Sequence, residues 1–344
     1  MERERVRVAV AGCHRMLMRD LAGHNFASAF AAIDSTEIVA VFDHGEEARA
    51  EFAAVWRGVW GEIATYGDFG QMLAEIRPDI LCIATRQTMH ADQVEAALEA
   101  GVRGILCDKP LATSLAEMDR IVAACAAIPL AFGLDRRWVQ AYRYLREVLA
   151  DGLLGRVSSL VAYGLPNAIN HGCHWYDAIL ALLGDPEPIW VSGRLYDLTA
   201  EPIDSRRRMD PSASAQIGFD KGMVAYVTGG GPKGMGFDIA GEGGRLAIYA
   251  DAAAASFWRV DASEPEILSL PVSEGEWPAG TAMVNDLVQA LHQGGRTACD
   301  IEEARRATEI GFALHSSAAQ GGAIVALPCA DRSLRVESFP WGNE

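Results

Sequence analysis

The sequence predicts two domains. Residues 1–133 are expected to form a doubly wound parallel α/β sheet, and residues 134–344 an α+β domain with a large, mostly antiparallel sheet. Up to residue 133, short and continuously apolar segments alternate with segments of helical length, which is typical of a parallel sheet covered on both faces. After residue 133 the chain changes to short strands with glycine-rich turns, framed by helices. A length of 344 residues also favours two domains over one.

The first domain is expected to alternate strictly between strand and helix. Its apolar strands are predicted at 6–11, 37–42, 79–84, 102–107 and 129–133. Helices are predicted from the end of the first strand to about residue 33, and at 46–56, 68–76, 90–100 and 114–127. Pro78 bounds the third helix, Gly101 closes the fourth, and Ser114 with Glu117 forms a capping-box pattern that begins the fifth.

The second domain is expected to begin with a helix at 139–149, a strand at 157–163 and a helix near 174–183. Short strands then follow between residues 187 and 270, for example at 216–219, 223–227, 237–240 and 246–249. Two helices are predicted last, at 282–292 and 301–319, the second capped by Asp300. No internal repeat or low-complexity linker is visible, so we expect the two domains to share an extensive interface.

Composition narrows the class of protein. Half of the residues are hydrophobic, while the net charge of −16 would repel nucleic acid. The one run of basic residues, Arg206–Arg208, is flanked by Asp204 and Asp210. The seven cysteines never occur as Cys-x-x-Cys, which favours reduced thiols in a cytoplasm. With neither a signal peptide nor a membrane span in view, we expect a soluble cytoplasmic protein that binds neither nucleic acid nor membrane.

The most informative motif follows the predicted strand 102–107 and reads Asp108-Lys109-Pro110. Ligands of parallel α/β sheets bind outside the carboxyl ends of the strands, and an amine there is placed for chemistry on a ligand. The bond before Pro110 is one that can be cis. The alternative is a solvated turn with one exposed charge, which the neighbouring motifs disfavour.

The end of the first strand predicts a modified dinucleotide-binding loop. Such loops read Gly-x-Gly-x-x-Gly, whereas here Gly12 is followed by Cys13, His14, Arg15 and Met16. Only the first glycine of the pattern is present. Phosphate binding would therefore depend on backbone N–H groups at the start of the next helix, with His14 or Arg15 supplying positive charge.

Asp43 closes the second strand at the place where a carboxylate binds the hydroxyls of the adenosine ribose. No arginine follows immediately, because Arg49 lies a turn or more into the next helix. A carboxylate there would repel a 2′-phosphate, so NAD is expected rather than NADP. Asp43 also has the alternative role of capping the following helix, which is compatible with ribose binding.

Over nearly its whole length, the chain resembles the Gfo/Idh/MocA family of nicotinamide-dependent sugar and polyol dehydrogenases. Segments 79–85 and 97–101, with His90 between them, are similar to the family's fourth strand, its nicotinamide-side loop and the next helix. The stretch 107–112 is similar to its Cys-Glu-Lys-Pro signature, with Asp108 in place of Glu. The segment 133–138, with Arg136 and Arg137, resembles the start of the second domain, and 240–244 and 318–328 resemble late elements.

The resemblance implies an N-terminal Rossmann domain that binds NAD, and a second domain that assembles a homodimer or homotetramer through its sheet. The residues expected to contact the cofactor are Gly12, Cys13, His14, Arg15, Met16, Asp43, Thr85, Arg86, His90, Asp108, Lys109 and Pro110. For His90 a hydrogen-bonding role at a helix start is an equal alternative, and for Arg86 a plain surface charge.

The family's second motif reads Asp-x-Gly-x-His-x-x-Asp at a helix start. Gly172, His174 and Asp177 match it, while Asn170 stands in place of the first Asp. Residues four apart share a helix face, so Asn170 and His174 are expected to reach one substrate. The residues expected to contact substrate are Lys109, Arg137, Asn170, His171 and His174.

Oxidation of a secondary alcohol needs a proton acceptor beside the hydride acceptor. His174 is the expected general base, and Lys109 is expected to donate a hydrogen bond to the reacting oxygen and favour alkoxide character. Lys109 as the base is an open alternative. Asn170 does not titrate, so we expect it to orient groups, and we expect a lower pKa for His174 than in relatives with Asp.

The expected function is NAD-dependent oxidation of a secondary hydroxyl of a sugar, glycoside or inositol-like polyol, or reduction of the corresponding ketone. Two alternatives remain open. One is a non-catalytic dinucleotide-binding sensor or regulator, suggested by the altered glycine loop and Asn170. The other is an enzyme that uses tightly held NAD for transient oxidation and elimination. No metal is expected, because His171, Cys173 and His174 do not by themselves make three or four converging ligands.

Overall fold

The computed structural model describes residues 5–19, 25–196, 210–230, 234–275 and 277–336. The chain groups into two compact units. The first contains Met1–Ala112, Glu117–Trp138 and Glu274–Glu302; the second contains Thr113–Ala116, Val139–Ser273 and Glu303–Glu344. The expected single boundary after residue 133 therefore differs from the observed grouping, because a helix late in the sequence packs with the first unit.

The first unit is a six-stranded parallel sheet with the order β3-β2-β1-β4-β5-β6. Its strands are β1 Val6–Ala11, β2 Thr36–Phe42, β3 Ala64–Tyr66, β4 Ile80–Ile83, β5 Gly104–Cys107 and β6 Leu130–Phe132. Every residue of β4, β5 and β6 is buried, as the continuously apolar runs predict. The chain reverses direction across the sheet between β1 and β4, which is the switch point where ligands of such sheets bind.

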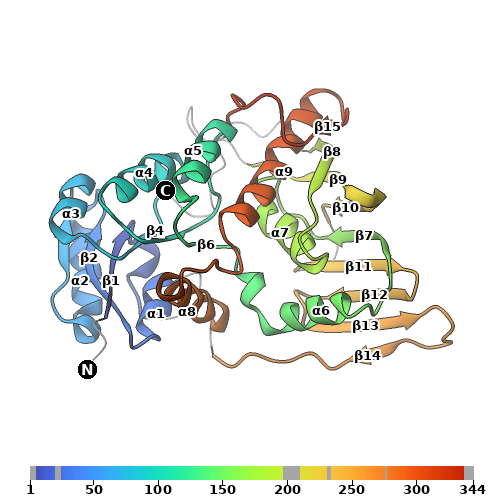
Figure 1. Cartoon of the computed structure of the whole chain (residues 1–344), viewed down its shortest axis with the longest axis horizontal. Helices are drawn as coiled ribbons and strands as arrows, with labels where there is room; N and C mark the ends of the chain where they lie inside the picture. Colours follow the sequence, from blue (N-terminus) through green and yellow to red (C-terminus); the bar gives the residue numbers. More distant parts are fainter. Residues whose placement is uncertain (1–4, 20–24, 197–209, 231–233, 276, 337–344) are drawn as a thin grey trace. The chain divides into compact units, whose positions relative to one another are not determined.

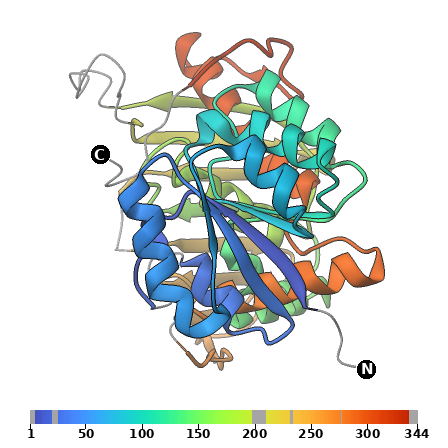
Figure 2. The same cartoon turned by 90° about the vertical axis from the view of Figure 1, so that its left-hand side faces the viewer.

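Helices cover both faces of this sheet. They are α1 Phe26–Ala31, α2 Glu46–Trp60, α3 Phe69–Ile76, α4 His90–Glu99, α5 Leu115–Cys125 and α8 Pro278–Gln293. Figure 1 shows α3, α4 and α5 along one face and α1 and α8 along the other. In Figure 2, which looks onto this unit, the strands fan out from one another and α2 (blue) runs beside them. The doubly wound architecture is confirmed.

Two elements of the first unit differ from the prediction. The long helix expected after Gly12 is wrong: a short 3-10 turn, η1, covers His14–Met16, and α1 begins only at Phe26. The reason is Asn25, whose side chain accepts the Ser28 N–H at 3.0 Å and so starts the helix there. Residues 20–24 lie outside the described part of the chain. The short strand β3 was not predicted, because three half-exposed or exposed residues give no periodic signal.

The second unit is a nine-stranded sheet with the order β14-β13-β12-β11-β7-β10-β9-β8-β15. Its strands are β7 Val157–Tyr163, β8 Pro188–Leu195, β9 Ala213–Phe219, β10 Val224–Thr228, β11 Gly236–Gly241, β12 Gly244–Tyr249, β13 Ala254–Arg259, β14 Glu266–Leu268 and β15 Val325–Ala326. All neighbours are antiparallel except β7 and β10. This confirms the expected mostly antiparallel sheet.

Three helices complete the second unit: α6 Gln140–Ala150, α7 Gly172–Leu182 and α9 Ile301–Ala319. Alternate strand residues such as Leu160, Ile217 and Leu246 are buried, while Tyr226 and Trp258 remain exposed on the other face. All seven cysteines are free and buried, as the reduced-thiol prediction requires. Within the described residues, no helix combines the length and apolar composition that crossing a bilayer requires.

Candidate functional site

Gly12 forms the corner where β1 ends. Its φ of +85° lies in the left-handed region, and a Cβ atom there would lie 2.7 Å from the carbonyl oxygen of Ala84. Its N–H donates to the Phe42 carbonyl at 2.8 Å. The backbone after β1 therefore touches both the end of β2 and the loop after β4, and only glycine allows this close approach.

Asp43, at the end of β2, is fastened to the loop after β1. Its Oδ2 accepts the Cys13 N–H at 3.0 Å, and its Oδ1 accepts the Gly45 N–H at 3.0 Å. The exposed His14 places Nε2 3.5 Å from Oδ1. Burial alone would raise the pKa of Asp43, but the two backbone N–H groups and His14 together lower it below its usual value. Asp43 is therefore a carboxylate at neutral pH, and burial raises the pKa of the adjoining Cys13 thiol.

Arg49 lies closer to the end of β2 than its position in α2 suggests. Its Nη1 donates to the carbonyl oxygen of Asp43 at 2.6 Å and to that of His44 at 3.1 Å. No arginine follows Asp43 immediately, as the sequence states, but the Arg49 side chain reaches the end of β2 from the first turn of α2. A long side chain one turn into a helix reaches back over the preceding loop.

The loop after β5 carries Asp108, Lys109 and Pro110, and the Lys109–Pro110 bond is cis. Asp108 joins this loop to the loop after β1: its Oδ2 is 3.1 Å from Nη1 of Arg15, and its Oδ1 accepts the Lys109 N–H at 2.8 Å. Lys109 is 8% exposed and Asp108 4%. An amine in such a position is largely withdrawn from water. Its hydrogen bonds and its charge act more strongly there than they would in water.

His90 joins the loops that follow β4 and β5. One ring nitrogen, Nε2, lies 3.2 Å from the Thr85 carbonyl oxygen, and the other, Nδ1, lies 3.1 Å from that of Leu111. The Sγ of Cys107 lies 3.5 Å from the same Nδ1. His90 is fully buried and makes the contacts that the hydrogen-bonding alternative expects, while its contact with the cofactor stays a prediction.

Gln93 also fastens the loop after β4, because its Oε1 accepts the Thr85 hydroxyl at 2.6 Å. Gln93 was not predicted from the sequence, although a polar residue on the buried face of a helix is a signal for such a contact. Arg86 in the same loop is exposed, and its contact with the cofactor stays a prediction. Met16 is buried, and its carbonyl oxygen accepts the Trp56 indole N–H at 2.7 Å.

In the second unit, Asn170, His174 and Asp177 are at most 4% exposed around the start of α7. His171 is half-buried and is oriented by Asn167, which the sequence analysis missed. The Oδ1 of Asn167 accepts the His171 N–H at 2.7 Å, so its Nδ2 faces Nδ1 of the His171 ring at 2.9 Å as a donor. A neutral His171 therefore carries its proton on Nε2.

A further carboxylate that sequence reasoning missed is Asp210. Its Oδ2 accepts the N–H groups of Ile169 at 2.8 Å and Asn170 at 2.6 Å, and its side chain is 2% exposed. The Nε2 of His315 in α9 lies 3.9 Å from its Oδ1. In the sequence Asp210 stands out only as a neighbour of the basic run, and a separation of 40 residues hides its contact with Asn170.

Arg137, one of the residues expected to contact substrate, is hydrogen-bonded within the first unit, and its contact with substrate stays a prediction. It is 5% exposed in the first unit, and its Nη1 donates to the Ala298 carbonyl at 3.3 Å. The adjoining Arg136 pairs with Asp135 at 2.9 Å, and Asp135 accepts the Trp277 indole N–H at 3.0 Å. Residues 135–137 thus bond Trp277 and Ala298, which lie on either side of α8 in the sequence.

The structure therefore assembles the predicted residues in two groups. In the first unit, Gly12, Asp43, Thr85 and Lys109 follow the carboxyl ends of the neighbouring strands β1, β2, β4 and β5. In the second unit, the residues around the start of α7 lie together. Among the described residues, no three His, Cys, Asp or Glu side chains converge as a metal site would require.

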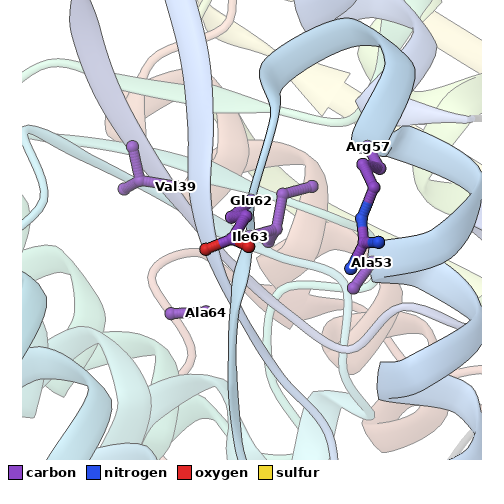
Figure 3. Close-up of a pocket in the computed structure, with 6 residues that line it drawn as sticks. All are labelled: Val39, Ala53, Arg57, Glu62, Ile63 and Ala64. Atoms are coloured by element: carbon purple, nitrogen blue, oxygen red, sulfur yellow. The ribbon is translucent and has the colours of Figure 1, made fainter.

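Two surface pockets of the first unit lie elsewhere. One, of about 350 Å³, is lined by Val39, Ala53, Arg57, Glu62, Ile63 and Ala64; Figure 3 shows Ala53 and Arg57 of α2 on one side and Val39 on the other. The other, of about 390 Å³, lies where the chain enters β6 and includes Arg296 and Asp300. Neither pocket contains a predicted site residue.

Comparison with known proteins agrees with this architecture. Residues 6–132 match the model of the oxidoreductase family with an NAD-binding Rossmann fold, Gfo/Idh/MocA. The chain is 37% identical over 134 residues to D-apiose dehydrogenase of Paraburkholderia graminis, covering 38% of this chain and 34% of that one. It is 31% identical over 130 residues to D-xylose 1-dehydrogenase (NADP(+)) of Hypocrea jecorina, covering 37% of this chain and 32% of that one. The matched region thus spans about a third of each relative.

The likeness of fold extends over both units. Myo-inositol 2-dehydrogenase from Lactobacillus plantarum superposes with a TM-score of 0.71 over 94% of this chain and 99% of that one, at 18% identity. That degree of identity speaks for the fold alone. The sequence match, the strand order and the glycine corner after β1 agree with one another: residues 6–132 are similar to the Gfo/Idh/MocA oxidoreductase family with its NAD-binding Rossmann fold.

Proposed function

We propose that the chain is an NAD-dependent oxidoreductase that oxidises a secondary hydroxyl of a sugar, glycoside or inositol-like polyol, or reduces the corresponding ketone. The observation that supports it most is Lys109. Only three of the 30 lysines and arginines of the chain are lysines: Lys109, Lys221 and Lys233. A chain that uses arginine almost everywhere has a lysine at the buried end of β5, where an amine and a guanidinium differ in size and in acid–base behaviour.

The residues at the strand ends fit a dinucleotide. Gly12 has no side chain at the corner after β1, and the ionised Asp43 keeps acceptor capacity for ribose hydroxyls beyond its two backbone bonds. Cys13, His14, Arg15 and Met16 of the same loop, with Thr85, Arg86, Asp108 and Pro110, are proposed to line the cofactor. Arg49 is held by two carbonyl oxygens, so Asp43 governs this corner and favours NAD over NADP.

In the proposed reaction the nicotinamide accepts the hydride when bound. His174 accepts the hydroxyl proton as the carbon–hydrogen bond breaks, so that the alcohol becomes a ketone and the imidazole becomes imidazolium. Lys109 donates a hydrogen bond to the reacting oxygen, and its charge favours the alkoxide that develops there. Asn170 and His171 orient the substrate, since an amide and an Nε2–H imidazole supply hydrogen bonds at the start of α7. A contact of Arg137 with substrate remains a prediction that its present hydrogen bond to Ala298 does not support.

A second copy of the chain is the proposed partner of the open sheet face. Three aromatic side chains of this face are exposed: Tyr226 of β10 (42%), Tyr249 of β12 (50%) and Trp258 of β13 (46%). Aromatic side chains of this kind are enriched in the contact surfaces of oligomers. A homodimer or homotetramer would bury them, and light scattering of the purified chain tests this.

Calorimetry with NAD and NADP, followed by NADH absorbance over a panel of sugars and polyols, tests the function. We expect NAD to bind and NADH to form. Lys109→Ala and Lys109→Arg should each lower kcat by about 10² or more, because both remove the amine. Arg103→Ala is the matched control: it removes an exposed cation at the opposite end of β5 and should leave kcat unchanged.

The outcomes separate the alternatives. NAD binding without turnover of any substrate would favour a dinucleotide-binding sensor, for which the altered loop at His14–Met16 speaks. Substrate turnover without net NADH would favour transient oxidation by tightly held NAD. Absence of NAD binding would refute all three.

A further inference from the structure

The segment that leads into α7 is capped from a distant part of the chain. α7 begins at Gly172, and the side chain of its N-cap residue His171 makes no capping hydrogen bond to the helix. Asp210, just before β9, accepts with a single oxygen, Oδ2, the N–H groups of Ile169 and Asn170, the two residues before that N-cap.

The capping contacts form a continuous series. The carbonyl oxygen of Pro211 accepts the Ala168 N–H at 2.8 Å, so residues 210–211 pair three successive N–H groups. The Ile169 carbonyl in turn accepts the Cys173 N–H at 3.1 Å, which opens the first turn of the helix. Asp210 therefore fixes the backbone from which the side chains at 170 and 174 project.

Asp210 also brings a negative charge to this helix start. A carboxylate at a helix N-terminus interacts favourably with the helix dipole, and its bonds to N–H groups are charge-assisted. The titratable groups that face it are His315 of α9, with Nε2 at 3.9 Å, and Tyr176 of α7, whose pKa is raised by burial and then by Asp210.

We propose that Asp210 is a positioning residue of the acid–base site: it holds residues 168–170, which lead into α7, and so fixes where Asn170 and His174 project. The proposal rests on the proposed function, in which His174 accepts a proton.

Hydrogen–deuterium exchange of the full chain tests the capping contact without any substrate. Asp210→Ala should speed exchange in peptides covering residues 168–174 by about tenfold, because two charge-assisted bonds are lost. Asp210→Asn keeps one acceptor oxygen and should give an intermediate rate. Asp261→Ala removes an exposed carboxylate of the same unit and serves as the control. Exchange within twofold of wild type in Asp210→Ala would overturn the capping role.

Steady-state kinetics test the consequence for catalysis. Asp210→Ala should lower kcat by about 10² with a smaller change in KM, because a misplaced acid–base group affects the chemical step. Asp210→Asn keeps one acceptor oxygen for the two N–H groups, so it should recover part of the kcat that Asp210→Ala loses. A kcat as low as that of Asp210→Ala would overturn the positioning role.

The two assays distinguish the failure of this proposal from failure of the proposed function. If wild-type protein oxidises none of the substrates, the proposed function fails, while the exchange measurement still decides whether Asp210 caps α7. If wild-type protein is active and the exchange is altered without loss of kcat in Asp210→Ala, the cap exists but positions nothing that catalysis needs, and the proposal is refuted.

Discussion

Replacing His90 by phenylalanine removes the fully buried ring that joins the loops after β4 and β5. Burial lowers the pKa of His90 despite hydrogen bonds with the Thr85 and Leu111 carbonyls, so the ring is neutral at pH 7.5 and donates one N–H. Losing that bond costs about 1 kcal/mol, and leaving a buried carbonyl without a donor costs about 2 kcal/mol more. We therefore expect His90→Phe to lower the free energy of unfolding by about 3 kcal/mol.

Urea denaturation at pH 7.5 measures this loss. His90→Gln keeps an N–H donor and should lose about 1 kcal/mol. His292→Phe changes an exposed histidine of α8 in the same unit and should stay within about 0.5 kcal/mol of wild type. If His90→Phe unfolds at the same urea concentration as His292→Phe, the ring does not brace the two loops.

The pH dependence gives a second check on His90. Because its pKa is lower in the folded chain than in the unfolded one, its contribution to stability is fully present above pH 6.5, the ordinary value. That contribution is lost as the pH falls through the folded-state pKa. The stability difference between wild type and His90→Phe should therefore shrink on acidification, and a difference that grows toward acid pH would contradict this reasoning.

Three other substitutions test separate contacts. Gly12→Ala puts a Cβ atom 2.7 Å from a carbonyl oxygen at positive φ. Calorimetry should therefore find that NAD binding is lost, and thermal unfolding should show that the free energy of unfolding falls by at least about 2 kcal/mol. Asp43→Ser removes the carboxylate at the end of β2, and the ratio of NADP to NAD affinity should rise by about tenfold or more. Glu309→Gln removes a carboxylate that is 2% exposed and bonds Arg332, so thermal unfolding should show a free energy of unfolding lower by about 3 kcal/mol. The control Glu264→Gln changes an exposed side chain and should lower the free energy of unfolding by less than about 0.5 kcal/mol.

The strands of the first unit were predictable almost to the residue. Continuously apolar runs between helical segments located β1, β2, β4, β5 and β6, and the motif around Lys109 located the end of β5. The helix after Gly12 was not predictable in the same way. The apolar pattern of the expected helix runs past Asn25, but the Asn25 side chain starts a new helix there. Periodicity does not reveal which of two competing start signals a chain uses.

The candidate site was predictable only as far as local motifs reach. Lys109, His174 and Asp43 stand in patterns of adjacent residues, so their positions follow from the sequence. Asp210 bonds a backbone 40 residues away, and Arg49 reaches back across a turn to carbonyl oxygens. Such contacts depend on tertiary packing and on the direction of a long side chain, which neither spacing nor composition encodes.

Because α8 belongs to the first unit, that unit is discontinuous in sequence. A Cβ atom at Gly104 of β5 would lie 3.6 Å from side-chain atoms of both Leu287 and Leu291, and Trp277 packs against Phe26 of α1 with ring centroids 5.6 Å apart. During synthesis these partners emerge only after the whole strand-rich segment of the second unit has been made. A fragment ending at residue 138 would expose this apolar surface and aggregate, so an autonomous cofactor domain must be built by joining residues 1–138 to 274–302.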